Sequence, residues 1–196
     1  MNIKIDVPDG ISNDWRIESF NVPKNDISQV FSLMKTGRGV PPGDYKRLKR
    51  NGTLVMSNAP DEIRDFIRFV YRAKGNVLVN GLGLGVLLKA LLNKKEVISV
   101  TVIEKSKDVI NLVADTYLKD KRVTIINADA FEYKPAKDAY FDAVWHDIWD
   151  YITADNLPEM KKLTRKYGRK ASYQESWCRA QCELAEKRSK NNRFRW

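Results

Sequence analysis

The sequence predicts an α/β fold with an open, mostly parallel sheet, a small N-terminal β/α extension and C-terminal helices. β-type and helix-type segments alternate between residues 76 and 146, which is typical of a sheet built from strand–helix–strand units. The first of these β-type runs ends in three alternating glycines. No further β-rich run follows Asp150, so we expect the sheet to be shortened after its fourth strand.

The N-terminal extension is predicted to comprise residues 1–57. Its apolar alternation favours short strands around a Pro-Asp-Gly turn, and an Asn-Gly pair marks a hairpin-type turn further on. Apolar residues at helical spacing favour one short helix in between. The strands are expected at 3–7, 15–22 and 53–56, the helix at 26–35 and a Gly/Pro-rich loop at 36–43.

The core domain is predicted to comprise residues 58–155. It opens on a good helix start, because Asn58 can cap the helix and Pro60 and two acids fall in the first turn. Helical spacing then continues up to Gly75. The following strands are expected at 76–80, 97–103, 122–127 and 140–146, and the helices at 84–93, 106–118 and, as a short piece, near 130–133.

The C-terminal segment, residues 156–196, is predicted to be helical, with helices at 157–167 and 172–188. It is also basic. The whole chain has a net charge of +10, and residues 158–196 hold 12 Lys/Arg against 4 Asp/Glu, a net charge of +8. A basic segment can contact phosphate backbones, so nucleic acid is a candidate partner. The alternative is a solvated helix face with a frayed end.

Composition narrows the class of protein. With 196 residues and 43% hydrophobic content, the chain can form one domain with an appendage. The longest apolar stretch, Val77 to Leu92, is too interrupted to span a membrane. The N-terminus has no secretory hydrophobic region, so we expect a cytoplasmic protein without a membrane partner. Cys178 and Cys182 lie four residues apart, which argues against a disulfide, and a single histidine argues against a histidine-rich metal site.

The glycine turn is the strongest functional signal. Gly81, Gly83 and Gly85 let the chain bend and bring backbone N–H groups close to a ligand. Glu104 ends the next apolar run, 19 residues after Gly85, near the roughly 20-residue spacing of a nucleoside-binding unit. Its carboxylate can accept hydrogen bonds from both ribose hydroxyls. Val86 replaces the third glycine of a dinucleotide fingerprint, and no Lys-Ser/Thr of a Walker loop follows. The alternative is an ordinary crossover whose glycines only tighten a turn.

Several motifs together resemble a known family. The segments 77–92, 102–105, 127–133 and 140–144 resemble, in order, the motifs of the spermidine synthase (aminopropyltransferase) branch of class I S-adenosylmethionine (SAM)-dependent transferases. Asp147-Ile148-Trp149-Asp150 matches that family's D-x-x-D, and residues 51–57 resemble its G-x-L-x-L-S strand. The resemblance covers roughly residues 51–150. It implies a Rossmann-like SAM-transferase sheet and SAM or decarboxylated SAM as the cofactor.

The resemblance also implies residue roles. Glu104 would hold the ribose, and Asp129 would lie beside the adenine. Asp147 would be the acid in the catalytic position, and Asp150 an acid that faces the substrate. All four acids follow apolar runs, which independently places them at the carboxyl edge of a parallel sheet, where ligands of open α/β folds bind. The predicted cofactor-binding residues are Asn80, Gly81, Gly83, Gly85, Glu104, Lys105, Asp129 and Ala130.

Two departures from the family keep several functions open. Leu84 stands where spermidine synthases carry an acid that faces the aminopropyl group, and the family's C-terminal strands are missing or replaced. We therefore favour a SAM-dependent methyltransferase with a small-molecule or basic acceptor. One alternative is an aminopropyltransferase that uses decarboxylated SAM. Another is a non-catalytic nucleoside- or nucleic-acid-binding module. A homo-oligomer could close the open edge of the sheet.

Residues at the end of the fourth strand have two interpretations each. For His146 we favour a locally hydrogen-bonded residue that ends the strand, over a role in acid–base chemistry. For Asp147 we favour a functional carboxylate over a cap of the following helix-like turn. Trp145 and Trp149 flank this edge, where they could line a substrate pocket or belong to the core.

Overall fold

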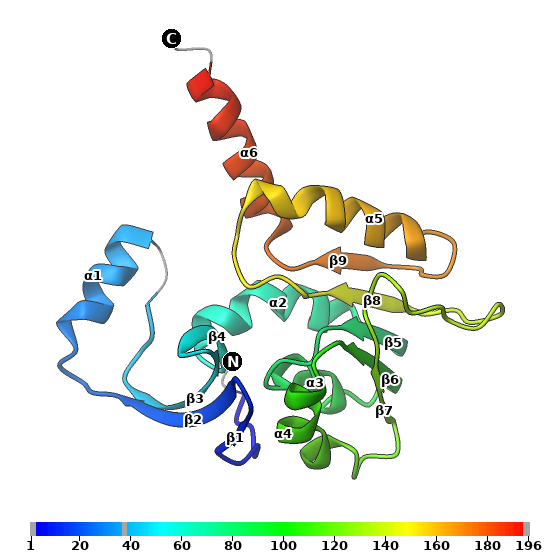
Figure 1. Ribbon diagram of the computed structural model, residues 1–196, viewed down its shortest axis with the longest axis horizontal. Helices are drawn as coiled ribbons and strands as arrows, with labels where there is room; N and C mark the ends of the chain where they lie inside the picture. Colours follow the sequence, from blue (N-terminus) through cyan, green and yellow to red (C-terminus); the bar gives the residue numbers. More distant parts are fainter. Residues whose placement is uncertain (1–2, 37–38, 194–196) are drawn as a thin grey trace.

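The computed structural model describes residues 3–36 and 39–193, which form two sheets and their flanking helices (Figure 1). The N-terminal sheet is antiparallel, with strands in the order β1-β2-β3-β4. The helix α1 lies between its second and third strands and stands away from the rest of the molecule. The bounds of these elements are β1 Gly10–Ser12, β2 Trp15–Val22, α1 Ile27–Thr36, β3 Gly43–Arg50 and β4 Thr53–Ser57.

The second sheet is entirely parallel, with strands in the order β7-β6-β5-β8-β9. This arrangement confirms the predicted Rossmann-like α/β class. The strand order reverses at β5, which pairs with both β6 and β8, and ligands of such sheets bind outside the carboxyl ends at this reversal. The strands are β5 Gly75–Asn80, β6 Val97–Glu104, β7 Val123–Asn127, β8 Ala143–His146 and β9 Gln174–Ser176.

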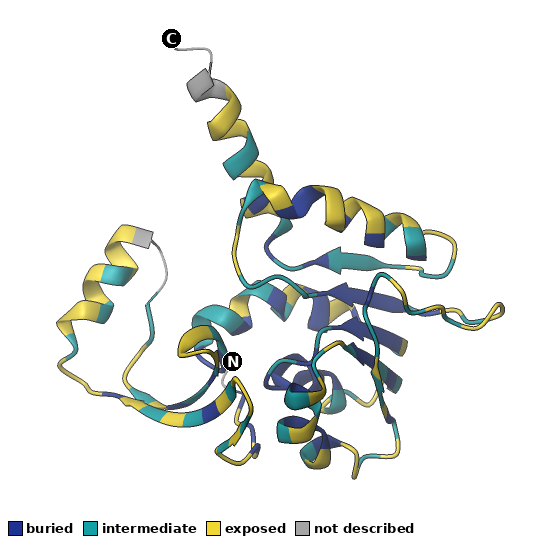
Figure 2. Cartoon of the chain, viewed as in Figure 1, coloured by how far each residue is buried: buried dark blue, intermediate teal, exposed yellow. Residues whose placement is uncertain are grey.

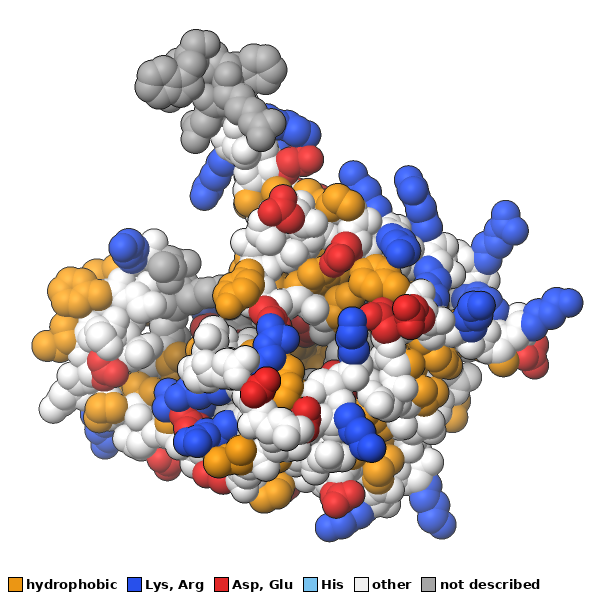
Figure 3. Space-filling view, in the orientation of Figure 1, with side chains coloured by type: hydrophobic (Ala, Val, Ile, Leu, Met, Phe, Trp, Pro, Cys, Tyr) orange, Lys and Arg blue, Asp and Glu red, His pale blue; other side chains and the backbone are white. Residues whose placement is uncertain are grey.

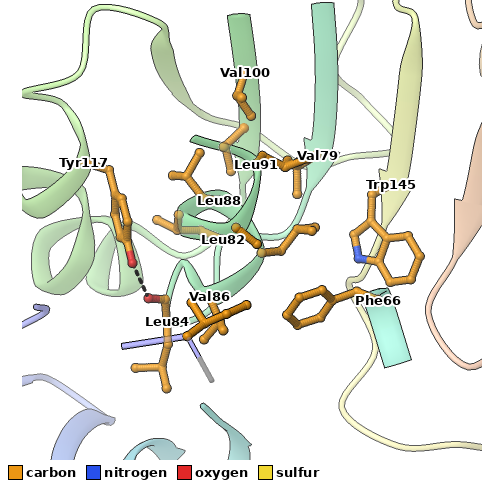
Figure 4. Packing of buried hydrophobic residues seen from close by; sticks show 14 of the residues in the cluster. Phe66, Val79, Leu82, Leu84, Val86, Leu88, Leu91, Val100, Tyr117 and Trp145 are labelled. Carbon is orange, nitrogen blue, oxygen red and sulfur yellow. Dashed lines mark hydrogen bonds between the residues drawn. The ribbon is translucent and has the colours of Figure 1, made fainter. Parts of the chain in front are cut away.

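Helices cover both faces of the parallel sheet because neighbouring side chains of each strand point to opposite faces. Val77 and Val79 of β5 pack in one cluster with α2, α3 and α4, and Leu78 packs in another with α5. Figure 4 shows the first cluster, in which Leu88 and Leu91 of α3 approach the strands and Tyr117 donates a hydrogen bond to the Leu84 carbonyl (3.2 Å). These helices are α2 Pro60–Arg72, α3 Val86–Leu92, α4 Lys107–Tyr117 and α5 Leu157–Tyr167.

The N-terminal segment differs from the expectation of a strand at 3–7. Ile3, Ile5 and Val7 are buried while Lys4 and Asp6 are exposed, but this segment pairs with no strand. Its period-two pattern comes from packing into the main hydrophobic cluster. The first strand is β1 instead. The basic stretch 45–50, for which the sequence suggested no element, belongs to β3, the strand between β2 and β4.

The start of α2 also corrects the sequence prediction. The N-cap is Ala59, whose side chain makes no capping bond. Asn58 instead connects separate segments, because its side chain accepts a hydrogen bond from the Lys46 N–H (2.7 Å) and donates to the Ile3 carbonyl (3.3 Å). Asparagine is a suitable N-cap residue, but the side chain of Asn58 makes its hydrogen bonds with residues distant in the sequence instead.

The C-terminal region contains a strand that the sequence did not predict. Residues 174–176 form β9, which extends the sheet beyond β8 with Val144 opposite Gln174, so the sheet has a fifth strand. The expectation of a helix at 172–188 is therefore wrong at its start, and α6 (Arg179–Arg193) begins after this strand. The Gln-Glu-Ser sequence has no apolar alternation, and pairing with the edge of β8 decides its conformation.

Two further boundaries differ from the prediction. Near 130–133 the chain forms a turn, in which the N–H groups of Glu132 and Tyr133 donate to the Asp129 carbonyl (3.0 and 2.8 Å), and no helix. The fourth core strand is shorter than expected and starts at Ala143. No helix of the described residues is long and apolar enough to cross a membrane. In Figure 2, α1 and α6 are mostly exposed and extend away from the buried sheet.

Candidate active site

A cleft of about 550 Å³ lies at the carboxyl ends of β5, β6 and β8. Eight of the ten predicted site residues line it: Gly81, Gly83, Glu104, Lys105, Asp129, Ala130, Asp147 and Asp150. The other walls come from the N-terminal sheet, the start of α2 and the segment after β9. A second, more open hollow of about 970 Å³ lies beside Asp6 and Tyr117 and includes none of the predicted residues.

Glu104 is fixed by the backbone of the glycine turn. Its two carboxylate oxygens accept hydrogen bonds from the Leu82 N–H (2.8 Å) and the Ser106 N–H (2.7 Å). Burial raises the pKa of Glu104, and these hydrogen bonds oppose the rise because they stabilise the ionised form. Each oxygen has a second lone pair. A carboxylate held in this way at a cleft wall can receive two neighbouring hydroxyl groups.

The three glycines are required by the packing of the chain itself. All have a positive φ, at 100° for Gly81, 51° for Gly83 and 71° for Gly85. A Cβ atom would lie 1.9 Å from the Asp147 carbonyl oxygen at Gly81 and 2.2 Å from the Met56 sulfur at Gly83. At Gly85 it would lie 2.3 Å from the Tyr117 ring. The evidence for a ligand therefore comes from the cleft and Glu104, and the glycines by themselves do not supply it.

Two of the predicted cofactor-binding residues do not line the cleft. Gly85 faces Tyr117, as its close approach shows. Asn80 is fully buried, and its side chain lies 2.8 Å from Nδ1 of His146. Leu84, the residue in place of the family's acid, is also fully buried and lies outside the cleft lining.

Asp129 and Lys105 form one side of the cleft mouth. The Lys105 ammonium lies 2.8 Å from the Asp129 carboxylate, whose other oxygen accepts the Phe131 N–H (2.7 Å). The hydrogen bond from Lys105 is the main reason why the pKa of Asp129 is lowered. Asp129 is thus held as an anion next to Ala130 and the ring of Phe131, which also line the cleft.

The opposite end of the cleft is acidic and aromatic. Asp147 follows β8 directly, and burial raises its pKa to about 7, although the Trp145 indole N–H lies 3.4 Å from its carboxylate. Asp150 forms an ion pair with Arg50 of β3. No helix follows Asp147, since the next helical turn starts at Ala154 and is capped by Thr153. The interpretation of Asp147 as a helix cap is therefore wrong.

Glu62 is a site residue that sequence reasoning missed. It lies in the first turn of α2, lines the cleft and accepts a hydrogen bond from the Ser57 N–H (3.1 Å). Burial raises its pKa to about 8, and the charges of Asp61, Asp147 and Asp65 add to the rise. In the sequence Glu62 is an ordinary first-turn acid. Only the packing of α2 against the end of β8 brings it to Asp147.

Four tryptophans line the same cleft: Trp15, Trp145, Trp149 and Trp177. Trp149 donates a hydrogen bond to Glu159 of α5 (2.7 Å), and Trp177 to Asp65 of α2 (3.3 Å). Trp145 and Trp149 were expected at this edge. Trp15 comes from β2 and Trp177 follows β9, so no local pattern could place them here. Figure 3 shows orange and red side chains together in the hollowed centre of the molecule.

His146 belongs to a buried network behind the cleft, which confirms the structural interpretation of this residue. Nδ1 lies 2.8 Å from the Asn80 amide nitrogen, and Nε2 lies 3.2 Å from Oε1 of Gln174 on β9. An amide NH₂ can only donate, so Nδ1 accepts and Nε2 carries the proton. Burial, with a smaller effect from Lys166, lowers the pKa of His146 to about 4. The ring is therefore neutral at physiological pH.

This neutral histidine predicts a stability that depends on pH. The unfolded chain protonates His146 near its ordinary pKa of 6.5, and the folded chain only near 4. The unfolded state thus binds more protons between these values, so the free energy of unfolding falls as the pH drops, by up to about 1.4 kcal/mol per pH unit. Urea unfolding of wild type and His146→Gln between pH 7 and pH 4.5 tests this, since other titrating groups are common to both. Parallel pH dependences in the two proteins would contradict it.

Comparisons with known proteins agree with the resemblance of the motifs. No protein-family model matches the chain. A polyamine aminopropyltransferase of Leptospira interrogans is 34% identical over 119 residues, which are 53% of this chain and 24% of that protein. The matched region thus spans about a quarter of that curated relative. This match confirms the resemblance to aminopropyltransferases.

Solved structures of similar fold include both spermidine synthases and methyltransferases. The spermidine synthase of Thermotoga maritima has a TM-score of 0.49 and 21% identity, covering 84% of this chain and 52% of its own. A spermidine synthase in complex with the transition state analogue AdoDATO has a TM-score of 0.44 and 23% identity, covering 76% and 49%. The N-methyltransferase NodS of Bradyrhizobium japonicum has a TM-score of 0.45 and 16% identity, covering 56% and 60%. These are similarities of fold.

Proposed function

We propose that this protein is a SAM-dependent transferase, and that it transfers a methyl group to a basic nitrogen of its acceptor. One observation carries the proposal. A single cleft has a backbone-fixed carboxylate, Glu104, at the end of β6, and a carboxyl group whose pKa burial raises to about 7, Asp147, directly after β8. The first suits a nucleoside, and the second suits proton transfer.

The residues of the cleft fit a bound SAM. Glu104 would accept hydrogen bonds from the two ribose hydroxyls, since both of its oxygens are already oriented by the turn. Asp129, held as an anion, would lie beside the adenine, with Ala130 and Phe131 against the ring. When bound, SAM supplies an electrophilic methyl carbon on a sulfonium. The residues of the chain orient the acceptor and remove its proton.

The acceptor end of the cleft favours a cation. Glu62 and Asp147 bring two carboxyl groups to a wall that also holds tryptophan rings, and a third carboxyl group, Asp150, is paired with Arg50 of the same cleft. Carboxylates pair with ammonium groups, and indole faces attract cations. An arriving ammonium would favour the ionised form of Asp147, whose pKa near 7 then allows it to take the proton that the nitrogen must lose.

A second candidate reaction is aminopropyl transfer from decarboxylated SAM. The observation in its favour is the 34% identity to a polyamine aminopropyltransferase, over a segment that is 53% of the chain. The observation against it is Leu84, because an apolar, fully buried residue at this position offers no carboxylate to an aminopropyl ammonium. A third candidate is a nucleoside-binding module without turnover on the same scaffold.

Calorimetry separates these functions. We expect SAM and S-adenosylhomocysteine to bind, decarboxylated SAM to bind more weakly and NAD not to bind. Labelled SAM then identifies the acceptor in a screen of polyamines, basic peptides and nucleobases. Transfer from decarboxylated SAM at a higher kcat/KM than from SAM would replace the methyltransferase proposal with the aminopropyl one. Binding without turnover on any acceptor would support the binding module.

Glu62→Gln is expected to raise KM for a cationic acceptor about tenfold and to leave SAM affinity unchanged. The pKa of Glu62 is about 8, so above this pH the variant removes an ionised carboxylate from the acceptor end of the cleft, and a hydrogen bond to a charged group contributes about 1.5–3 kcal/mol. Steady-state kinetics with varied acceptor measures the change. Glu96→Gln, at an exposed position outside the cleft, is the matched control. An unchanged KM in Glu62→Gln would show that this carboxylate does not contact the acceptor.

A further inference from the structure

Basic side chains gather on the outer face of α5 and on the loop between β7 and β8. Figure 3 shows blue side chains over this part of the molecule. We define the α5 surface by its six exposed members: Lys134, Lys137, Lys161, Lys162, Arg165 and Arg169. None of the six forms an ion pair within the part of the chain that the structure describes.

Two further lysines hold the loop against α5. The Lys166 ammonium donates to the carbonyls of Ala130 and Phe131 (2.8 and 2.9 Å). Lys170 donates to the carbonyls of Ala136 and Lys137 (2.9 Å each). These bonds keep Lys134 and Lys137 of the loop beside the helix. The loop and α5 therefore present these six basic residues on one surface.

The basic charge of α6 is arranged differently. Arg179 pairs with Glu183 (2.9 Å) and Lys190 with Glu186 (3.1 Å), each one helical turn apart. These pairs reduce the net field of the helix. Lys187 and Arg188 of α6 are exposed and form no ion pair among the described residues, so unpaired positive charge is present on both helices, and its larger cluster lies on α5 and the adjoining loop.

Two aromatic rings accompany the charges of the α5 surface. Lys162 lies over the half-buried Phe131 ring, 4.8 Å from its centre, and Tyr140, on the same loop as Lys134 and Lys137, is 54% exposed. The four basic residues of α5 and its end, from Lys161 to Arg169, span about 12 Å at 1.5 Å per residue. A row of basic side chains of this length attracts the phosphate groups of a nucleic acid, and every base can stack on an aromatic ring.

We propose that the α5 surface binds single-stranded nucleic acid. An exposed tyrosine ring on the same loop as two unpaired lysines fits this partner better than an anionic membrane, which attracts charge but offers no bases to stack. The surface borders the cleft, because Phe131 and Glu159 of α5 line the cleft mouth. The proposal does not depend on the transferase reaction, since its test changes six basic residues, none of which lines the cleft.

Fluorescence anisotropy of the full chain with labelled 20-nucleotide oligo-U and oligo-dT tests the proposal. If all six side chains contact phosphates, log K falls with log salt at a slope of about −4, which is a loss of a few hundredfold between 50 and 200 mM salt. The variant with all six residues changed to Gln should lose at least about tenfold in affinity at 50 mM salt and most of this slope. The double variant Lys161→Gln/Arg165→Gln should reduce the slope by about 1.4.

A matched control removes the same charge elsewhere. Changing six exposed residues outside the surface to Gln gives the same net charge and should alter affinity by no more than about threefold: Lys24, Lys35, Lys74, Lys95, Lys119 and Lys121. Absence of oligonucleotide binding at 50 mM salt would overturn the proposal. So would equal losses in the two sextuple variants, or a surface-dependent binding to phosphatidylserine vesicles without binding to either oligonucleotide. Circular dichroism confirms that each variant is folded.

Discussion

Asp147→Asn is expected to lower the rate of transfer at least about a hundredfold, with the Kd of SAM changed by less than about threefold. Asn has nearly the shape of Asp but cannot take a proton from the attacking nitrogen, and general bases contribute about 10²–10⁴ to rates. Single-turnover kinetics on the acceptor found by labelled SAM measures the rate, and calorimetry measures the affinity. Transfer at the wild-type rate would remove Asp147 from the chemistry.

The pH profile gives this prediction a second readout. In the proposed reaction the carboxylate of Asp147 is the reactive form, and its pKa is about 7, so the wild-type rate should rise as the pH increases through neutrality. Glu62 has a pKa of about 8 and interacts with Asp147, so the apparent pKa of the rate profile belongs to the pair. The other charged groups near this pair are Asp61, Asp65, Asp150 and Arg50, which is paired with Asp150. The rise near pH 7 should be absent from Asp147→Asn.

Stability separates a catalytic loss from a folding defect. Burial disfavours the ionised Asp147, so the free energy of unfolding falls as the pH rises from the ordinary pKa of 3.8 to the folded value of about 7, and the neutral Asn avoids this loss. We therefore expect Asp147→Asn to be at least as stable as wild type at pH 8 in urea unfolding. A large loss of stability in this variant would attribute its low rate to structure.

Glu104→Ala is expected to weaken SAM binding tenfold to a hundredfold. The variant removes the proposed acceptor of two ribose hydroxyls, and a hydrogen bond to a charged group contributes about 1.5–3 kcal/mol. It also leaves the N–H groups of Leu82 and Ser106 without their partner, so some loss of stability accompanies it. Calorimetry is done at a temperature where circular dichroism shows the variant folded.

A charge control accompanies this measurement. Glu132→Ala removes an exposed carboxylate on the loop after β7 and should leave the Kd of SAM unchanged. The two variants have the same net charge, so a loss of SAM affinity that is confined to Glu104→Ala would support ribose binding by Glu104. Equal SAM affinities in wild type and Glu104→Ala would contradict the assignment of the nucleoside end of the cleft.

The sequence by itself determined the parallel sheet and much of the cleft floor. Strands and turns can be predicted from local sequence patterns, here an apolar run, a glycine triplet and a following acid. Because parallel strands end at one edge, Glu104, Asp129 and Asp147 could be expected together, and all three line the cleft. The resemblance to aminopropyltransferases rests on the same residues.

Only the tertiary structure decided the rest of the site. Glu62 and Trp15 reach the cleft because α2 and the N-terminal sheet pack beside it, and β9 exists because β8 offers it a free edge. Asn80 has a polar side chain at a strand end, yet it is buried against His146 and does not line the cleft. Contacts between residues distant in the chain leave no periodic trace in the sequence, because they depend on how whole elements pack.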